Sequence, residues 1–92
     1  MADGDHETDE ARLRQQMRTA HKRLGANIRR AREHLGLSQE DLALQARCGG
    51  VRRLARMEAG RRCVPVLTLE KLARALGMSA KDLLAGVNAE AQ

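Results

Sequence analysis

Apolar residues recur at intervals of three and four along most of the chain, which is the spacing of helices that bury one face. The first stripe starts near Asp9 and ends at Gly36, a residue typical of helix C-termini. Its members are Leu13, Met17, Ala20, Leu24, Ile28, Ala31 and Leu35. This stripe predicts either one long helix or two helices hinged near Gly25. No segment of useful length alternates at period two with β-branched residues, so the predicted fold is all-α.

Two further helices are predicted by their starts. Ser38 is placed as an N-cap with Asp41 three residues later, and Ser79 with Asp82 repeats the same capping box. The first box predicts a helix with Leu42, Ala43 and Ala46 facing inward. The second predicts a short last helix.

Glycines and the single proline delimit the two remaining helices. A short helix is predicted from about Val51 to Ala59, between the Gly49-Gly50 pair and Gly60. Its residues Leu54 and Met57 have the spacing of a buried edge, which leaves Arg52, Arg53 and Arg56 on the outer side. After Pro65, Thr68 is predicted to cap a helix from Leu69 to Leu76, which Gly77 ends.

The charge of the chain is uneven along its length. Its 92 residues predict one small domain, and 17 Lys and Arg against 12 Asp and Glu give a net charge of +5. Five acids, at positions 3, 5, 7, 9 and 10, stand in the first ten residues, so residues 11–92 carry +10. This strongly basic segment is suited to binding a polyanion, and nucleic acid is favoured over an anionic membrane as the partner. Residues 1–8 are predicted to be an acidic disordered head, and residues 9–22 a helical extension.

Composition excludes several classes of protein. Without Phe, Tyr or Trp the chain has no ring on which to stack a splayed base, which disfavours the common modules for single-stranded RNA and DNA. Duplex DNA contacted by a helix in a groove remains. No apolar run of membrane-spanning length and no signal peptide is recognisable, so we expect a soluble cytoplasmic protein without a membrane partner.

Catalytic and metal chemistry are also disfavoured. Cys48 and Cys63 lack the spacing of zinc ligands, and we interpret them as reduced core or loop residues rather than a redox switch. The three histidines are scattered. No Ser/His/Asp or Cys/His set and no phosphate-binding glycine loop appears, so we expect no enzyme activity, no metal and no cofactor.

The two central segments, "SQEDLALQA" and "VRRLARMEA", are separated by a short glycine-containing turn. A helix-turn-helix needs a first helix whose N-terminus touches the phosphate backbone and a second whose outer face enters the major groove. The apolar edges of both segments can pack together and leave the arginines outside. The pair therefore predicts a helix-turn-helix.

Four segments, in order, extend this pattern: "LGANIRRARE", "LSQEDLA", "MEAGRR" and "LEKLARALGMSAKDLL". From about Arg23 to Leu84 the sequence resembles the lambda-repressor-like, or Xre-type, helix-turn-helix family. The resemblance implies a compact five-helix domain over residues 23–85, with residues 9–22 as an N-terminal helical extension and residues 86–92 as a frayed tail. It also implies operator binding, usually as a dimer, and most often repression of transcription.

The resemblance also implies the DNA contacts. Ser38 and Gln39 match the phosphate-contacting start of the second helix, where the amides and helix dipole favour anions. Glu58 matches an acidic residue that is nearly constant in the family. It is expected to pair with a basic residue or to cap a backbone group. Seven residues, where the family usually has six, separate Ala46 from Leu54, and Arg47 replaces the usual turn glycine, so the register of base contacts is open by one position. The candidate DNA-binding residues are Ser38, Gln39, Val51, Arg52, Arg53, Arg56, Arg61, Arg62 and Arg30.

Within this set we expect different roles. Arg52 and Arg53 are the first candidates for guanine contacts, because arginine binds the O6 and N7 atoms of guanine through two hydrogen bonds. Arg56, one turn later, is expected nearer the groove edge. Arg61 and Arg62 are expected to contact the phosphate backbone.

A single recognition helix buries too little surface for specific affinity, so we expect a homodimer. Two surfaces compete for its interface: C-terminal Leu83, Leu84 and Val87, and N-terminal Leu13 and Met17. Two alternatives stay open. One is an antitoxin that autoregulates its operon and binds a toxin as protein partner. The other is a helical protein-interaction module built on the long first stripe.

Overall fold

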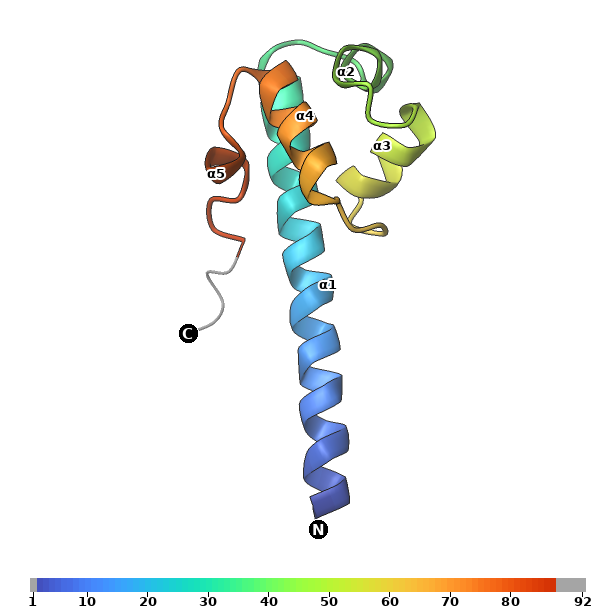
Figure 1. Ribbon diagram of the computed structural model, residues 1–92, viewed down its shortest axis with the longest axis vertical. Helices are drawn as coiled ribbons and strands as arrows, with labels where there is room; N and C mark the ends of the chain where they lie inside the picture. The colour runs from blue at the N-terminus through green and yellow to red at the C-terminus, as the bar shows by residue number, and fades with distance from the viewer. Residues whose placement is uncertain (1, 88–92) are drawn as a thin grey trace.

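The computed structural model describes the backbone of residues 2–87 and the side chains of residues 9–87. Over this range the chain forms helices and no strands, which confirms the all-α prediction. The helices are α1 (Ala2–His34), α2 (Gln39–Ala46), α3 (Val51–Glu58), α4 (Val66–Leu76) and α5 (Ala80–Leu83). Helices α2 to α5 surround the C-terminal half of α1 (Figure 1).

The long helix α1 is continuous through Gly25, so the first of the two sequence alternatives holds and there is no hinge. Gly25 has a different role. A Cβ atom at this position would lie 2.4 Å from the carbonyl oxygens of both Met57 and Glu58. The absence of a side chain therefore lets the end of α3 approach the backbone of α1.

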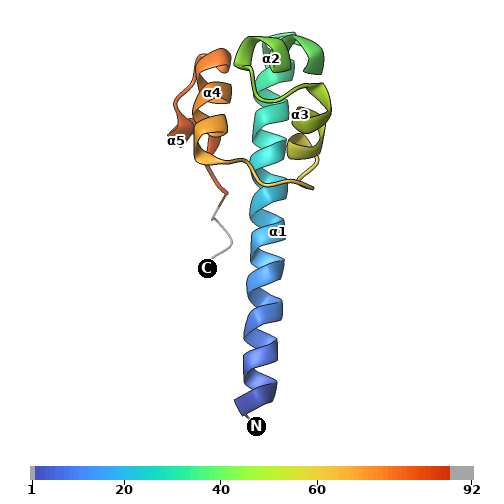
Figure 2. The ribbon, with the colours of Figure 1, turned by 45° about the vertical axis from the view of Figure 1, so that its right-hand side comes forward.

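The N-terminal half of α1 projects away from the other helices (Figures 1 and 2). Side chains 9–18 are all exposed, and the buried core begins at Leu24. Helix α1 begins at Ala2, and the disordered head over residues 1–8 stays a prediction. Although α1 is long, no helix in the described range is apolar enough to cross a membrane.

The core lies between the C-terminal half of α1 and the four shorter helices. Its fully buried larger side chains come from every helix: Ile28, Leu42, Leu54, Met57, Leu72 and Leu83. Val87 is also buried in it, so the predicted frayed tail is corrected at its start. Packing of this side chain and a hydrogen bond of 3.4 Å from Arg23 to the carbonyl of Gly86 hold the segment against α1. Residues 88–92 of the predicted tail lie outside the described residues.

The predicted helix starts are confirmed for α2 and α5. Ser38 with Asp41 and Ser79 with Asp82 both form complete capping boxes. The start of α4 was predicted wrongly: the helix begins at Val66, after Pro65, and Thr68 lies inside it. Proline has a fixed φ and no N–H, so it can stand at a helix start, and the Pro65 carbonyl accepts the Leu69 N–H at 2.8 Å.

Candidate nucleic-acid interface

The inner faces of α2 and α3 pack into the core through Leu42, Ala43, Ala46, Leu54 and Met57, as the sequence predicted. The turn between the two helices contains three residues with positive φ, namely Arg47 (52°), Gly49 (101°) and Gly50 (104°). Arg47 thus adopts the left-handed conformation that the usual glycine would supply, and its N–H donates to the Ala43 carbonyl at 3.0 Å. The two glycines after it accommodate the additional residue of the turn.

A buried ion pair connects α1 to α3. Arg32 Nε donates to Glu58 Oε2 at 2.7 Å, and Arg32 Nη2 donates to Oε1 at 3.0 Å. Arg32 Nη1 also donates to the Leu37 carbonyl at 2.9 Å. The hydrogen bond to Glu58 raises the pKa of Arg32 above its usual value, although burial opposes it. The expectation that Glu58 pairs with a basic residue is therefore confirmed, and its role is structural.

Gln39 joins this network. Its Nε2 donates to Glu58 Oε1 at 3.0 Å, which fixes the first residue of α2 against the last residue of α3. Ser38, one residue earlier, is exposed, and its hydroxyl accepts the Asp41 N–H at 2.9 Å. The predicted phosphate-contacting end of α2 is thus at the surface and is held beside α3.

The outer face of α3 carries Arg52 and Arg56. At 100° per residue these two side chains point away from the buried Leu54 and Met57, and both are exposed. Arg53 differs from the prediction because it is half-buried at the flank of α3. It lies against Gly49, where a Cβ would come within 2.8 Å of Arg53 Cδ. Its Nε is buried and has no hydrogen-bond partner among the described residues.

The other predicted DNA-binding residues lie in the loop after α3, at the start of α3 and on α1. Arg61 and Arg62 are exposed in the loop that follows α3. Val51 is half-buried at the start of α3, beside Leu44 and Arg47.

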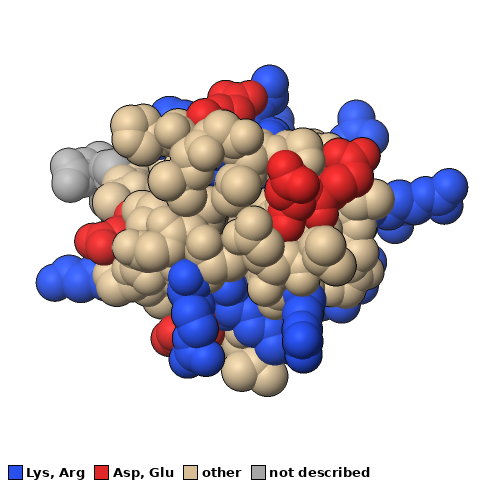
Figure 3. Space-filling view, turned by 90° about the horizontal axis from the view of Figure 1, so that it is seen from above, with Lys and Arg blue, Asp and Glu red and all other residues tan. Residues whose placement is uncertain are grey.

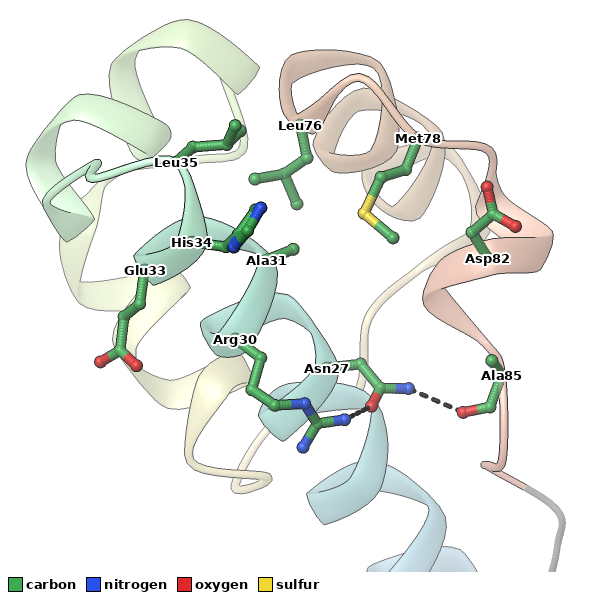
Figure 4. Close-up of a pocket in the computed structure, with 10 residues that line it drawn as sticks. All are labelled: Asn27, Arg30, Ala31, Glu33, His34, Leu35, Leu76, Met78, Asp82 and Ala85. Carbon is green, nitrogen blue, oxygen red and sulfur yellow. Dashed lines mark hydrogen bonds between the residues drawn. The ribbon is translucent and has the colours of Figure 1, made fainter.

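Arg30 lies on α1, away from α3, and its inclusion in the interface stays a prediction. Its guanidinium donates to Asn27, whose amide in turn donates to the carbonyls of Leu83 (2.7 Å) and Ala85 (2.9 Å) (Figure 4). The helical periodicity of α1 explains the separation. Arg30 is on the face toward α5, whereas Gly25 and Arg32 face α3.

The surface charge is unevenly distributed. In the view down α1 from above, Lys and Arg side chains gather along the lower edge and project from the right, whereas a group of Asp and Glu side chains lies toward the upper right (Figure 3).

Arg47 was not among the predicted DNA-binding residues, although it stands where the family usually has the turn glycine. The structure exposes Arg47 directly after α2, at the C-cap of that helix, so this departure from the family pattern was the available signal.

The predicted dimer residues fall into two groups. Leu83 is fully buried and Val87 is 8% exposed, so both belong to the core of one chain and are corrected as interface candidates. They pack inward because α5 closes the core over α1. Leu84, Leu13 and Met17 remain exposed, at 42%, 56% and 51%.

The cysteines do not form a site. Cys48 is buried in the turn between α2 and α3, and Cys63 is exposed in the loop before α4. Burial raises the pKa of the Cys48 thiol, which favours its neutral form. Among the described residues, no group of three or more His, Cys, Asp and Glu side chains is placed to hold a metal ion.

Comparison with known proteins agrees with this geometry. The family model described as Helix-turn-helix matches residues 28–83, more than half of the chain. The chain belongs to the Xre or lambda-repressor-like helix-turn-helix family. The matched segment begins within α1 and ends with α5, so it leaves the projecting half of α1 outside.

Relatives of this helix-turn-helix protein are regulators. An uncharacterized HTH-type transcriptional regulator, y4dJ, of Sinorhizobium fredii (strain NBRC 101917 / NGR234) is 42% identical over 64 residues, which cover 68% of this chain and 80% of the relative. The controller protein C.AhdI of a restriction-modification system from Aeromonas hydrophila has a TM-score of 0.65 at 32% identity, over 67% of this chain and 92% of its own. The clp gene regulator ClgR of Corynebacterium glutamicum has a TM-score of 0.71 at 30% identity, over 77% and 74%. The protein is therefore a DNA-binding helix-turn-helix transcriptional regulator and not an enzyme.

Proposed function

We propose that this regulator represses transcription by binding a palindromic operator in the cytoplasm as a homodimer, with α3 of each protomer in the major groove. The observation that carries the proposal is the division of α3 into two faces. Leu54 and Met57 are fully buried, while Arg52 and Arg56 are exposed on the opposite side. A palindromic operator fits a dimer because each half-site takes one recognition helix.

Arg52 is our first candidate for a base contact, because it lies on the outer face near the start of α3. Its guanidinium has the geometry to bind guanine O6 and N7. Arg56 extends the same face by one turn. Arg53 would have to leave its place over Gly49 before it could contact a base, and its unpartnered Nε would then gain a hydrogen bond.

Phosphate contacts are assigned to residues at the ends of the two helices. Ser38 and Gln39 stand at the start of α2, where backbone N–H groups attract anions. Gln39 would keep its hydrogen bond to Glu58 and contact phosphate through its backbone N–H. Arg61 and Arg62 are exposed after α3 and are assigned to the backbone of the same half-site.

The test compares Arg52→Ala with Arg62→Ala in binding titrations on operator and scrambled duplex at several salt concentrations. Removal of a guanine contact by Arg52→Ala should cost about 1–3 kcal/mol on the operator and relax preference at one base pair per half-site. Arg62→Ala should weaken binding to both duplexes. It should also make the slope of log affinity against log salt shallower by about one unit for each phosphate that the variant no longer neutralises.

Arg53→Ala is the matched variant that removes an arginine from the flank of α3. It should leave base preference intact if Arg53 stays over Gly49. If Arg52→Ala also left base preference intact, the assignment of the outer face of α3 to the bases would be wrong. Equal affinity of the unmodified protein for operator and scrambled duplex would overturn the proposed sequence-specific function itself.

A further inference from the structure

The projecting half of α1 carries cations in line with the contact between α1 and α3. Gly25 marks this contact, because a Cβ there would lie 2.4 Å from the carbonyl oxygens of Met57 and Glu58. At about 100° and 1.5 Å per residue, Arg18 and Arg14 lie within about 20° of Gly25 around the helix and about 10.5 and 16.5 Å from it along the axis. Both side chains are exposed. The stripe of α1 that packs against α3 therefore continues past the domain as an exposed cationic stripe.

The loop after α3 joins this stripe. A Cβ at Gly60 would lie 2.7 Å from the Cα atom of Lys22, so the loop passes directly over α1 there. Arg61 and Arg62 follow Gly60 and are exposed, as is Lys22. Lys22 is about 6 Å along the axis from Arg18. These residues define a basic strip, whose members are Arg14, Arg18, Lys22, Arg61 and Arg62.

The basic strip has no acidic partner among the described residues. Residues 11–32 contain no Asp or Glu. The ion pairs that the described residues form with one another involve Arg29 and Arg32, which are outside the strip. Arg18 donates a hydrogen bond of 2.8 Å to Gln15, which is a neutral partner. The positive charge of the strip is therefore available to a polyanion.

We propose that the projecting half of α1 extends the DNA interface, with Arg18 and Arg14 bound to the phosphate backbone beside the phosphates that Arg61 and Arg62 contact. The proposal rests on the proposed function, because it requires α3 to lie in the major groove. It adds a binding surface outside residues 28–83, the segment that matches the helix-turn-helix family. Contacts of this kind position a protein on DNA and carry no sequence information.

The thickness of the helix layers brings the strip close to phosphate. Packed helices have axes about 8–10 Å apart, and the major groove is about 8.5 Å deep. When α3 lies in the groove, the phosphates at the groove edge therefore rise toward the level of α1. Recognition helices contact bases through their N-terminal residues, so the C-terminal end of α3 lies toward that edge. Helix α1 continues beyond this end of α3, which places the strip along the backbone (Figure 1).

The charge of the first ten residues limits the length of the strip. These residues contain five acids and no Lys or Arg, whereas residues 11–23 contain five Lys and Arg and no acid. Because acids repel phosphate, the contact should end near Arg14.

The first test measures the binding of the full chain to operator and scrambled duplex at several salt concentrations. Arg14→Gln with Arg18→Gln should weaken binding to both duplexes equally. The expected loss is about sixtyfold for each bound protomer at 0.1 M salt, because each phosphate contact contributes about eightfold there through counterion release. The slope of log affinity against log salt should become shallower by about 1.8 for each bound protomer.

Arg12→Gln with Lys81→Gln is the matched control, because it removes the same charge elsewhere. Arg12 lies about 140° from Gly25 around α1, and Lys81 is exposed on α5. The control should keep the slope of the unmodified protein, and both double variants should keep its thermal midpoint. An unchanged slope in Arg14→Gln with Arg18→Gln, or an equal loss in the control, would overturn the inference and leave the proposed function in place. Equal affinity of the unmodified protein for both duplexes would instead contradict the proposed function.

The second test locates the contacts by ethylation interference on the operator. Ethylation removes the charge of a phosphate, so it should weaken binding wherever the unmodified protein contacts the backbone. About two interfering phosphates in each half-site should disappear from the pattern of Arg14→Gln with Arg18→Gln, while those due to Arg61 and Arg62 stay. An identical pattern in the two proteins would contradict the inference. So would a variant that loses only its binding to phosphatidylserine vesicles, because the partner of the strip would then be an anionic membrane.

Discussion

At the scale of single residues, the pair of Arg32 and Glu58 is the contact on which the arrangement of α1, α2 and α3 depends most. Both side chains are buried, and Gln39 shares the carboxylate. Replacement of Arg32 by Met leaves Glu58 buried without its counter-charge. We expect this substitution to cost about 3–5 kcal/mol of unfolding free energy, measured by urea denaturation.

Arg29→Met is the matched control for this prediction. Arg29 also pairs with an acid at 3.1 Å, but the side chains of Arg29 and Glu33 are 64% and 53% exposed. Exposed pairs of this kind contribute about 0.3–0.5 kcal/mol. Equal destabilisation of the two variants would show that the buried pair has no special weight in the stability of the domain.

At the scale of helices, the contact of α1 with the end of α3 depends on Gly25. A glycine inside a helix normally makes the helix less stable than an alanine at the same position, by about 1 kcal/mol. Gly25→Ala should nevertheless destabilise the protein, because its Cβ would meet two backbone carbonyl oxygens at 2.4 Å. Overpacking of this kind typically costs about 1–3 kcal/mol, and thermal unfolding would measure it.

Ala26→Gly, one residue further along α1, isolates the helix-propensity effect and should cost about 1 kcal/mol or slightly more. Gly25→Ala should also weaken operator binding, since the end of α3 has to move away from α1 and therefore shifts with respect to α2. A stabilised Gly25→Ala variant with normal operator binding would mean that α1 and α3 can separate without consequence.

At the scale of the whole molecule, the projecting half of α1 and the domain should behave as separable parts. A chain that starts at residue 19 lacks Arg14 and Arg18 but retains every buried core residue, from Leu24 onward. We expect it to unfold at a midpoint close to that of the full chain, because side chains 9–18 are all exposed.

Calorimetry would make this comparison. The shortened chain should also bind DNA more weakly than a chain that starts at residue 11, because only the longer chain keeps Arg14 and Arg18. If it failed to fold, residues 2–18 would have a structural role in the domain that their exposure does not indicate.

The sequence by itself determined the local features of this protein. Both Ser-x-x-Asp capping boxes, the all-α fold and the buried edge of α3 were predicted correctly, because caps and helical periodicity depend on residues within a few positions of one another. The ordered motifs also predicted the helix-turn-helix family, and Glu58 was expected to pair with a basic residue.

Only the tertiary structure decided which residues share a surface. It buried Leu83 and Val87, folded Arg53 over Gly49 and placed Arg30 on the α5 side of α1. It also identified Arg32 as the partner of Glu58, 26 positions away in the chain. These outcomes depend on how helices distant in sequence pack against α1, and the periodicity of one helix gives the direction of its own faces but not which neighbour covers each face.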